Sequence, residues 1–300
     1  MSATGFGFGK IIIFNEHFVV YGSPAIASPI EQGCFVTLST TNENNNPNND
    51  VWQIQKSVIQ KYLQILNINA KNELNVSVQT SLIPAAGMGA SAAFCVASAR
   101  AISNFFSLNL TDEQINDLSF EGEKIFHGNP SGIDNTVSTF GKPIWFEKKE
   151  NILTENLKIK NALHIVIGFS GESGNTKDAV AKVATWKNSN LRKFNFLLER
   201  SKNLILRGRE ALADDDLEKV GRLMNENHKL LVEIGVSTPK LEKLIAIAKD
   251  SGALGAKITG SGCGGCIVAL ASNEGDQDKI DQSFLSFGFK SIKTKIRENL

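Results

Sequence analysis

The chain has 300 residues, of which 42% are hydrophobic and 21% charged, and its formal net charge is +1. This composition is typical of a globular protein of one or two domains, and it lacks the basic excess of most nucleic-acid-binding proteins. The four cysteines are too few for a disulfide scaffold. No apolar run approaches the roughly 20 residues that cross a bilayer, and no secretory signal is recognisable. We therefore expect a cytoplasmic protein with no nucleic-acid or membrane partner.

The first half of the chain predicts both strands and helices. Residues 10–22 (KIIIFNEHFVVYG) and 34–41 (CFVTLSTT) are rich in β-branched and aromatic residues, as buried strands are, and residues 73–83 alternate like a half-buried strand. The polar stretch 42–50 contains a proline and predicts a surface loop. Residues 51–66 have the spacing of a helix. The expected buried stripe of that helix consists of Val51, Ile54, Val58, Leu63 and Ile65 or Leu66.

A long apolar segment follows, and the chain changes character near residue 150. The segment from Ser91 onward is apolar on nearly every side, which predicts a buried helix. Thr111 and Gln114 have the spacing of a capping box, so we expect another helix to begin there. Residues 143–149 and 162–170 are expected strands. A boundary between these strands gives two predicted domains, over residues 1–150 and 151–300.

The second half is mostly helical. Helical spacing covers about residues 175–187, 191–213 and 216–233, and a further helix over 238–252 is closed by Gly252. Residues 256–272 (AKITGSGCGGCIVALAS) predict a glycine-rich loop that enters a strand. Near the end, SIKTKIR predicts a strand with one apolar and one solvated face. The apolar face would carry Ile292, Thr294 and Ile296, and the solvated face Lys293, Lys295 and Arg297.

The stretch PAAGMGASAA combines a proline, two glycines and a serine at the expected start of a helix. Gly87 and Gly89 carry no side chain, so a ligand can approach the backbone closely. A helix N-terminus has free N–H groups and the positive end of the helix dipole, which together suit a phosphate group. The stretch is neither a Walker A loop nor a dinucleotide fingerprint. Small residues equally allow tight helix packing, and this stretch alone leaves both interpretations open.

Two further clusters place polar groups in unexpected positions. Lys10 begins an apolar run that contains the polar triplet Asn15–His17, and buried polar groups are costly unless they are paired or functional. In EKIFHGNPSGIDN, a helical carboxylate at Glu123 is followed by a Gly-Asn-Pro-Ser loop and Asp134. The alternative role of Asp134 is that of a turn-forming residue.

A second glycine-rich loop, KITGSGCGGC at residues 257–266, also has the size of a phosphate-binding loop. Its Cys263 and Cys266 have C-x-x-C spacing, which can indicate redox or zinc chemistry. Both intervening residues are glycines, and no second Cys or His pair lies nearby. We therefore expect neither a redox pair nor a zinc site.

Taken together, six stretches in order along nearly the whole chain resemble the GHMP small-molecule kinases. They are KIIIFNEHFVVYGSPAIASPI, PAAGMGASAA, FHGNPSGIDN, GNTKDAVAKV, MNENHKLLVEIGVSTPKLEKL and KITGSGCGGC. The resemblance implies an α+β GHMP kinase fold, with a ribosomal-protein-S5-like N-terminal domain, a ferredoxin-like C-terminal domain and an active site in the cleft between them. It is most specific for the branch of the family that acts on mevalonate, and FHGNPSGIDN carries that specificity.

The resemblance also implies roles for individual residues. Asp134 matches the catalytic base and Lys10 the cation beside the reacting hydroxyl, while Ser91 and Glu123 match the ligands of Mg²⁺. The residues implied for ATP binding are Pro84, Ala85, Ala86, Gly87, Met88, Gly89, Ala90, Ser91, Ala92 and Ala93. The residues implied for substrate binding are Lys10, Glu16, His17, Asp134, Thr176, Gly260, Ser261 and Gly262, and Gly264 and Gly265 would help to close the site.

These roles are chemically consistent with phosphoryl transfer to an alcohol. A carboxylate can take the hydroxyl proton, a nearby ammonium favours the alkoxide, and Mg²⁺ prefers oxygen ligands. The chain departs from the family pattern at Asn15, where the family usually has Gly, and at Ala90, where it often has Ser. Met88 also replaces the usual Leu, a mild change.

The implied activity is ATP-dependent phosphorylation of the primary hydroxyl of mevalonate, in isoprenoid biosynthesis, with a homodimer as the implied assembly. The first alternative is another GHMP kinase, acting on phosphomevalonate or homoserine. The second is a pseudokinase that senses a small molecule or ATP, against which stands the presence of Lys10, Ser91, Glu123 and Asp134.

Overall fold

The computed structural model describes residues 1–40, 50–69, 74–148, 152–174 and 176–299. The chain forms two compact units that interleave along the sequence. Unit 1 contains Met1–Gly9, Gln32–Ile83 and Gly89–Gly141, and unit 2 contains Lys10–Glu31, Pro84–Met88 and Lys142–Leu300. The predicted pair of domains, 1–150 and 151–300, is a different partition of the chain and stays a prediction. Within the described residues, no helix is both long and apolar enough to span a bilayer.

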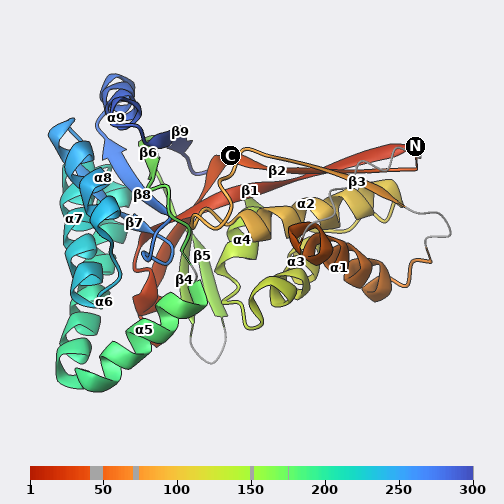
Figure 1. The fold of residues 1–300 in the computed structure, drawn as a ribbon, viewed down its shortest axis with the longest axis horizontal. Coiled ribbons are helices and arrows are strands. Elements are labelled where there is room, and N and C mark those ends of the chain that lie inside the picture. Colours follow the sequence, from red (N-terminus) through yellow and green to blue (C-terminus); the bar gives the residue numbers. More distant parts are fainter. Residues whose placement is uncertain (41–49, 70–73, 149–151, 175, 300) are drawn as a thin grey trace. The chain divides into compact units, whose positions relative to one another are not determined.

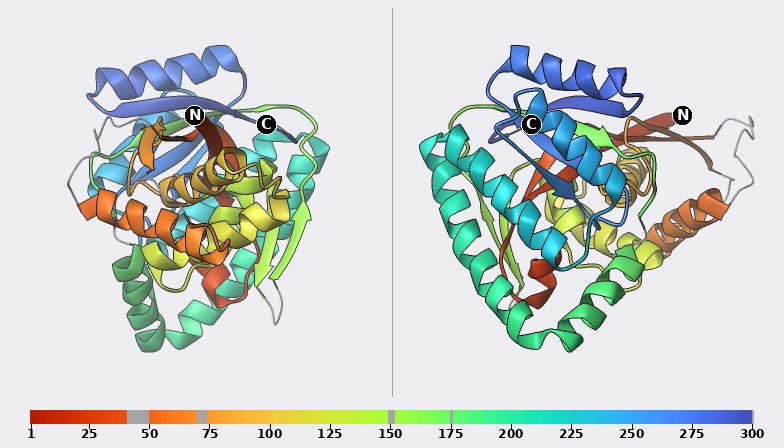
Figure 2. Two further views of the ribbon diagram at one scale, coloured as in Figure 1. Left: turned by 90° about the vertical axis from the view of Figure 1, so that its right-hand side faces the viewer. Right: turned by 60° about the vertical axis from the view of Figure 1, so that its left-hand side comes forward.

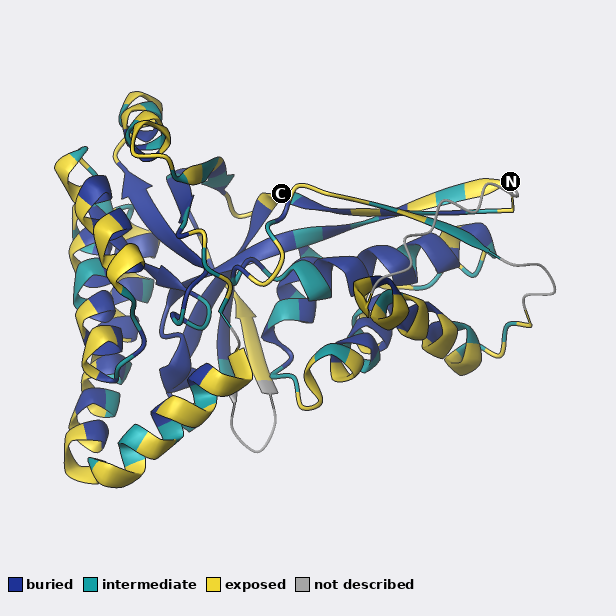
Figure 3. Ribbon diagram, in the orientation of Figure 1, coloured by how far each residue is buried: buried dark blue, intermediate teal, exposed yellow. Residues whose placement is uncertain are grey.

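Unit 1 is built around α2 (Ala90–Phe105), which is buried over most of its length because its residues are small and apolar (Figures 1 and 3). Gly7 lets β1 (Ser2–Phe14) approach this helix, since a Cβ there would lie 2.2 Å from the carbonyl oxygen of Ala93. Arg100 on α2 donates to the carbonyl oxygens of Phe6 and Thr139 at 2.9 and 2.7 Å, and to the Asp112 carboxylate at 2.7 Å. These contacts join α2 to β1, to α3 (Asp112–His127) and to the end of α4 (Ile133–Phe140).

The elements of unit 1 have the following bounds: α1 (Asp50–Ile65), β3 (Asn75–Thr80), α2 (Ala90–Phe105), α3 (Asp112–His127) and α4 (Ile133–Phe140), with the first part of β1 (Ser2–Phe14) and the last part of β2 (Ala25–Ser39). β3 pairs antiparallel with β2, from Cys34 opposite Thr80 to Ser39 opposite Asn75. Helix α3 begins with the predicted capping box, in which Thr111 and Gln114 cap each other.

Unit 2 contains a four-stranded antiparallel sheet in the order β7-β8-β6-β9. Helices separate β6 from β7 and β8 from β9, so the chain follows the βαββαβ path of a ferredoxin-like fold, as expected. The bounds are η1 (His17–Tyr21), β4 (Ile144–Lys148), β5 (Ile152–Asn156), β6 (Leu163–Phe169), α5 (Thr176–Ser189), α6 (Leu191–Asp214), α7 (Leu217–Glu233), α8 (Pro239–Asp250), β7 (Gly255–Thr259), β8 (Cys266–Ala271), α9 (Glu274–Ser286) and β9 (Lys290–Ile296).

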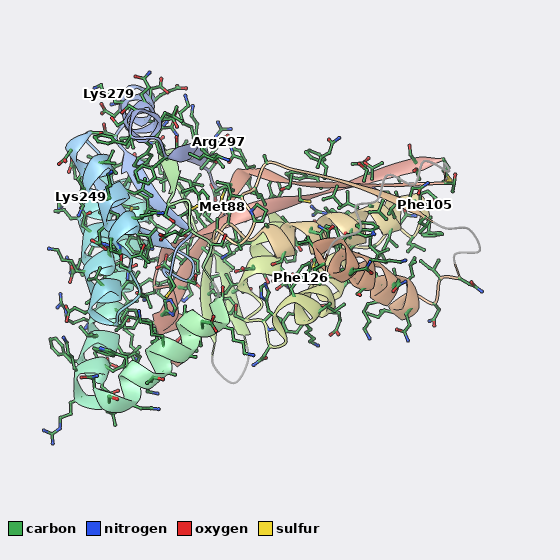
Figure 4. The ribbon with its side chains drawn as sticks, in the orientation of Figure 1. Met88, Phe105, Phe126, Lys249, Lys279 and Arg297 are labelled. Carbon is green, nitrogen blue, oxygen red and sulfur yellow. The ribbon has the colours of Figure 1, made fainter. Side chains whose placement is uncertain are left out.

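The helices of unit 2 cover its sheet. β7 and β8 are buried along their whole length (Figure 3), with α7 and α8 packed against β7. α9 lies over β9 in both views of Figure 2. The charged side chains of Lys249, Lys279 and Arg297 lie at the outside of this unit (Figure 4). The charged face predicted for the last strand is exposed at Lys293 on β9 and at Arg297 just after it, and these two side chains also form ion pairs with Asp278 and Glu31.

A second sheet has the order β1-β2-β4-β5, with β3 also paired to β2. β1 and β2 continue from one unit into the other, because the unit boundaries fall within these strands after Gly9 and Glu31. In unit 2, β2 pairs with β4 from Ala25 opposite Phe146 to Ala27 opposite Ile144. The same strand therefore contributes to both units.

Two local predictions are wrong. The predicted strand 10–22 ends at Phe14, because Asn15 has a left-handed backbone (φ 69°) and residues His17–Tyr21 form a 3-10 helix. On α1, Trp52, Val58, Ile59 and Tyr62 are buried, while Val51, Ile54 and Ile65 of the predicted stripe are exposed. The helices α4 and α9 and the strand β5 were not predicted. Of the predicted loop 42–50, residues 42–49 lie outside the described residues, and Asp50 begins α1.

Candidate active site

The first part of the predicted nucleotide loop, Pro84–Met88, belongs to unit 2. It packs against the glycine-rich loop of residues 257–266, which we call the third loop. Gly87 has a φ of 84°, and a Cβ on it would lie 2.8 Å from the carbonyl oxygen of Thr259. A Cβ on Gly260 would in turn lie 2.8 Å from the Cα of Gly87. Glycine is therefore required at both positions for the two loops to touch, as well as for the backbone angle at Gly87.

A third segment, Ser170–Gly174, completes this group of loops. Gly265 donates its N–H to the carbonyl oxygen of Glu172 at 2.6 Å, and Ser170 donates to the carbonyl oxygen of Gly265 at 2.9 Å. Lys10 donates its backbone N–H to the carbonyl oxygen of Met88 at 2.9 Å. Backbone contacts within unit 2 thus connect Lys10 to the Pro84–Met88 segment, and the third loop to Ser170–Gly174.

The turn after β1 places two predicted substrate residues beside the third loop. His17 is buried, and its Nε2 lies 2.9 Å from the carbonyl oxygen of Ser261. Because a carbonyl oxygen only accepts, Nε2 carries a proton in this contact. Burial lowers the pKa of the His17 imidazole, and the bond to Ser261 acts in the opposite direction. His17 is therefore a neutral donor that holds the third loop.

Glu16 forms a buried ion pair with Lys257 on β7. Its carboxylate is 2% exposed, and its Oε1 accepts a hydrogen bond from Lys257 Nζ, which belongs to a fully buried side chain. Burial raises the pKa of the Glu16 carboxyl, against the opposing effects of the Lys257 ammonium and, more weakly, of Lys10. The other carboxylate oxygen, Oε2, is buried without a hydrogen-bond partner among the described residues.

The departure at Asn15 has a structural reason. Its φ of 69° lies in the left-handed region, where glycine is favoured and asparagine is tolerated better than most residues. Its Nδ2 donates to Ser23 Oγ at 2.8 Å and to the carbonyl oxygens of Pro24 and Ser201 at 3.0 and 3.2 Å. The backbone N–H donates to Asn227 Oδ1 at 3.0 Å. The amide of Asn15, at the position where the family usually has glycine, thus forms its hydrogen bonds inside unit 2.

The second part of the nucleotide loop belongs to unit 1 and leads into α2. Gly89, with a φ of 69°, is the N-cap of this helix and offers no side-chain cap to the first N–H groups. The first turn contains Ala90, Ser91, Ala92 and Ala93. This arrangement has the uncapped helix N-terminus that the phosphate interpretation requires.

The two predicted magnesium ligands both approach one nitrogen of the His127 imidazole. Ser91 Oγ is 3.0 Å from Nε2 of His127, and Oε2 of the buried Glu123 is 3.8 Å from the same nitrogen. On the opposite side of the carboxylate, Cys95 Sγ lies 4.0 Å from Glu123 Oε1. A hydroxyl and a carboxylate oxygen in this proximity fit Mg²⁺, which takes few protein ligands and keeps several waters. An ion bound by both oxygens would replace the imidazole contact.

The structure places Asp134 and Thr176 at helix N-termini. Asp134 is half-buried in the first turn of α4, whose N-cap is Gly132. The negative charge of an aspartate here interacts favourably with the helix dipole, so a structural role at the start of α4 would by itself explain Asp134. Thr176 is the exposed first residue of α5. Asp134 belongs to unit 1 and Lys10 to unit 2, so their predicted cooperation stays a prediction.

The cysteines of the third loop are free, as are Cys34 and Cys95. Cys266 is buried at the start of β8, and burial raises the pKa of its thiol to about 12. A thiol with such a pKa is a poor nucleophile and metal ligand near neutral pH. This supports our prediction that Cys263 and Cys266 form neither a redox pair nor a zinc site.

Two residues of these clusters were missed by the sequence analysis. Lys257 is a lysine inside an apolar strand, which is as unusual as the polar triplet around Glu16. His127 follows Glu123 by four residues on α3, so the two side chains share a helix face. Both patterns were visible in the sequence, but only the fold shows which partner each side chain meets.

Comparison with known proteins shows which family the chain belongs to. The family model "GHMP kinases N terminal domain" matches residues 51–142, and the model "GHMP kinases C terminal" matches residues 209–288. The chain therefore belongs to the GHMP kinase family, whose members use ATP.

Within this family it belongs with the mevalonate kinases. The mevalonate kinase of Thermococcus sibiricus is 36% identical over 97% of this chain and 95% of its own, and that of Pyrococcus furiosus is 36% identical over 88% of each. Among solved structures, L. major mevalonate kinase in complex with R-mevalonate is 31% identical and superposes with a TM-score of 0.89 over 98% of this chain and 96% of its own. The Methanococcus jannaschii enzyme gives a TM-score of 0.84 at 25% identity, over 99% of this chain and 98% of its own. The predicted α+β GHMP kinase fold is confirmed.

Proposed function

We propose that this protein transfers the γ-phosphoryl group of ATP to the primary hydroxyl of mevalonate, giving 5-phosphomevalonate. The observation that carries the proposal is the likeness over 98% of the chain to a mevalonate kinase whose structure contains R-mevalonate. The buried polar turn Glu16–His17 and the contacting glycine loops of unit 2 support it, because they provide polar groups beside a close-packed backbone.

In the proposed mechanism, Asp134 takes the proton of the attacking hydroxyl, and the ammonium of Lys10 favours the resulting alkoxide. The backbone of Pro84–Ala93 binds the phosphates, with the α2 N-terminus facing their negative charge. Ser91 and Glu123 would hold Mg²⁺, which supplies charge neutralisation on the phosphates when bound. His17 positions the third loop through Ser261, and Gly260 and Gly262 allow its backbone to approach the ligands.

The test is a coupled assay of ADP release with a panel of acceptors. The panel contains R-mevalonate, phosphomevalonate, homoserine and galactose, each at several concentrations. We expect efficient turnover with R-mevalonate alone. Faster turnover with phosphomevalonate or homoserine would support the alternative GHMP kinases, and the absence of ADP release with every acceptor would support a ligand-sensing pseudokinase.

We further propose a cytoplasmic location and a homodimeric assembly for this enzyme. The family resemblance supports the second. Sedimentation velocity of the purified protein tests the assembly, and a species of 32.6 kDa across a wide concentration range would show a monomer instead.

A further inference from the structure

All three protons of the Lys257 ammonium have acceptors inside unit 2. Nζ donates to Glu16 Oε1, to the carbonyl oxygen of Ile258 at 2.6 Å and to that of Ile12 at 3.4 Å. A lysine ammonium has three protons, so no donor remains for a ligand. Lys257 is fully buried, and its three protons all have acceptors inside the protein.

The two oxygens of Glu16 have different surroundings. Oε1 is held by Lys257, whereas Oε2 is buried without a hydrogen-bond partner among the described residues. Leaving a buried acceptor of this kind unpaired costs about 1–3 kcal/mol, and more when it is charged. In a native structure such an oxygen usually meets an ordered water, an ion or a ligand that binds later.

The neighbouring contacts connect this carboxylate to residues for which the family resemblance implies substrate binding. Glu16 is followed directly by His17, which holds Ser261 of the third loop, and the Lys10 ammonium is close enough to lower the pKa of the Glu16 carboxyl. Two connections, Glu16 to Lys257 and His17 to Ser261, therefore attach the same short turn to β7 and to the loop that follows β7. The orientation of the turn is determined at both ends.

We propose that Lys257 is a positioning residue: it holds Oε1 of Glu16 on β7, so that Oε2 is presented as the acceptor for a hydroxyl group of the alcohol substrate. The inference rests on the proposed function, because it assigns Oε2 to the acceptor alcohol rather than to ATP. A carboxylate oxygen suits a hydroxyl donor and repels a phosphate. Lys257 thus acts on the affinity for the alcohol only through Glu16.

The experiment compares Lys257→Met, Glu16→Gln and the double variant with the wild type. Equilibrium binding of R-mevalonate without ATP is measured by calorimetry, and steady-state kinetics give KM for each substrate. We expect Lys257→Met to weaken mevalonate binding at least tenfold while KM for ATP stays within twofold. Lys293→Met, which removes an exposed ion pair with Asp278 on β9, is the control and should change neither constant.

The double variant separates positioning from folding. Removing Lys257 alone leaves a buried carboxylate without its counter-charge and can prevent folding, whereas removing both charges relieves that cost. If Lys257 acts through Glu16, adding Lys257→Met to Glu16→Gln weakens mevalonate binding by less than twofold further. A further tenfold loss in the double variant, an unchanged affinity in a folded Lys257→Met protein, or an equal loss of ATP affinity would each overturn the proposal. So would a double variant that fails to fold, because Lys257 would then be needed for structure alone.

The acceptor panel keeps this test independent of the proposed function. If the wild-type enzyme ignores mevalonate and uses another alcohol, the proposed substrate is wrong, and the same four proteins are compared with the alcohol that it accepts. If the enzyme uses mevalonate and Lys257→Met binds it normally, only the positioning role is wrong.

Discussion

The imidazole of His17 and the carbonyl of Ser261 are joined by a hydrogen bond of 2.9 Å, although 244 positions separate the two residues in sequence. The donor must be neutral His17, since burial lowers the pKa of its imidazole from the ordinary 6.5. This contact joins the turn after β1 to the loop between β7 and β8, and the burial of the same imidazole makes the stability of the protein depend on pH.

Acidification should destabilise the protein partly through His17. The unfolded chain takes up a proton on this imidazole near pH 6.5, whereas the folded chain resists protonation, so the stabilising effect is complete above that pH and is lost as the pH falls. Between pH 7.5 and 5.5, urea unfolding should show a loss of up to about 1.4 kcal/mol from this group. His17→Gln, which can still donate to Ser261, should lose correspondingly less. Equal losses in both proteins would contradict the assignment.

Gly87→Ala should be far more damaging than Gly288→Ala. Both glycines have left-handed backbones, with φ of 84° and 80°, so each substitution costs about 1–2 kcal/mol in backbone strain. Only Gly87 has an additional contact, because its Cβ would lie 2.8 Å from Thr259 O, while nothing lies within 4 Å of a Cβ on Gly288. Thermal unfolding and KM for ATP measure the difference. Similar melting temperatures and kinetics for the two variants would show that the loops adjust freely.

Asn15→Gly should reduce stability and leave the affinity for mevalonate unchanged. Glycine accepts the φ of 69°, but the buried partners Ser23, Pro24 and Ser201 lose the hydrogen bonds from Nδ2. We expect a loss of about 1–3 kcal/mol in the free energy of unfolding. Asn15→Ala should be worse, because it adds backbone strain to the same loss. A variant with normal stability and a changed KM for mevalonate would place the Asn15 side chain in the substrate pocket.

Ser91→Ala and Glu123→Gln should weaken the response to magnesium more than they weaken folding. Ser91→Ala removes the hydroxyl ligand and Glu123→Gln removes the negative charge of the carboxylate ligand, so the free Mg²⁺ needed for half-maximal activity should rise several-fold. Activity across a magnesium titration and the melting temperature are measured together. Ser98→Ala, on the same helix and equally conservative, is the control. Full activity of either variant at limiting magnesium would show that the predicted metal site is wrong.

Asp134→Asn should abolish most turnover without loss of stability. Asparagine retains the size of the side chain in the first turn of α4 but cannot accept the hydroxyl proton, and general-base catalysis typically contributes about 100- to 10,000-fold. Turnover should fall within that range while ATP still binds. Lys10→Met should also lower turnover, and much less so in the Asp134→Asn background, because groups that act as a unit are not additive. Near-normal phosphorylation of mevalonate by Asp134→Asn would exclude it as the base.

Much of the local structure and the candidate site could be predicted before the fold was known. Short-range rules were enough for three features. Capping predicts the box at Thr111, periodicity predicts the helices of the second half, and backbone freedom predicts the glycine loops. The order of the motifs along the chain identified the family, because residue type and spacing are properties of the sequence alone.

The tertiary structure decided which polar groups are partners. Glu16 meets Lys257 across 241 positions, and Asn15 meets Asn227 across 212, so no local pattern specifies either pair. The end of β1 at Phe14 and the buried face of α1 also depend on what packs against them. Desolvation is the physical reason: a charge or an amide removed from water needs a partner, and the chain fold alone determines which side chain supplies it.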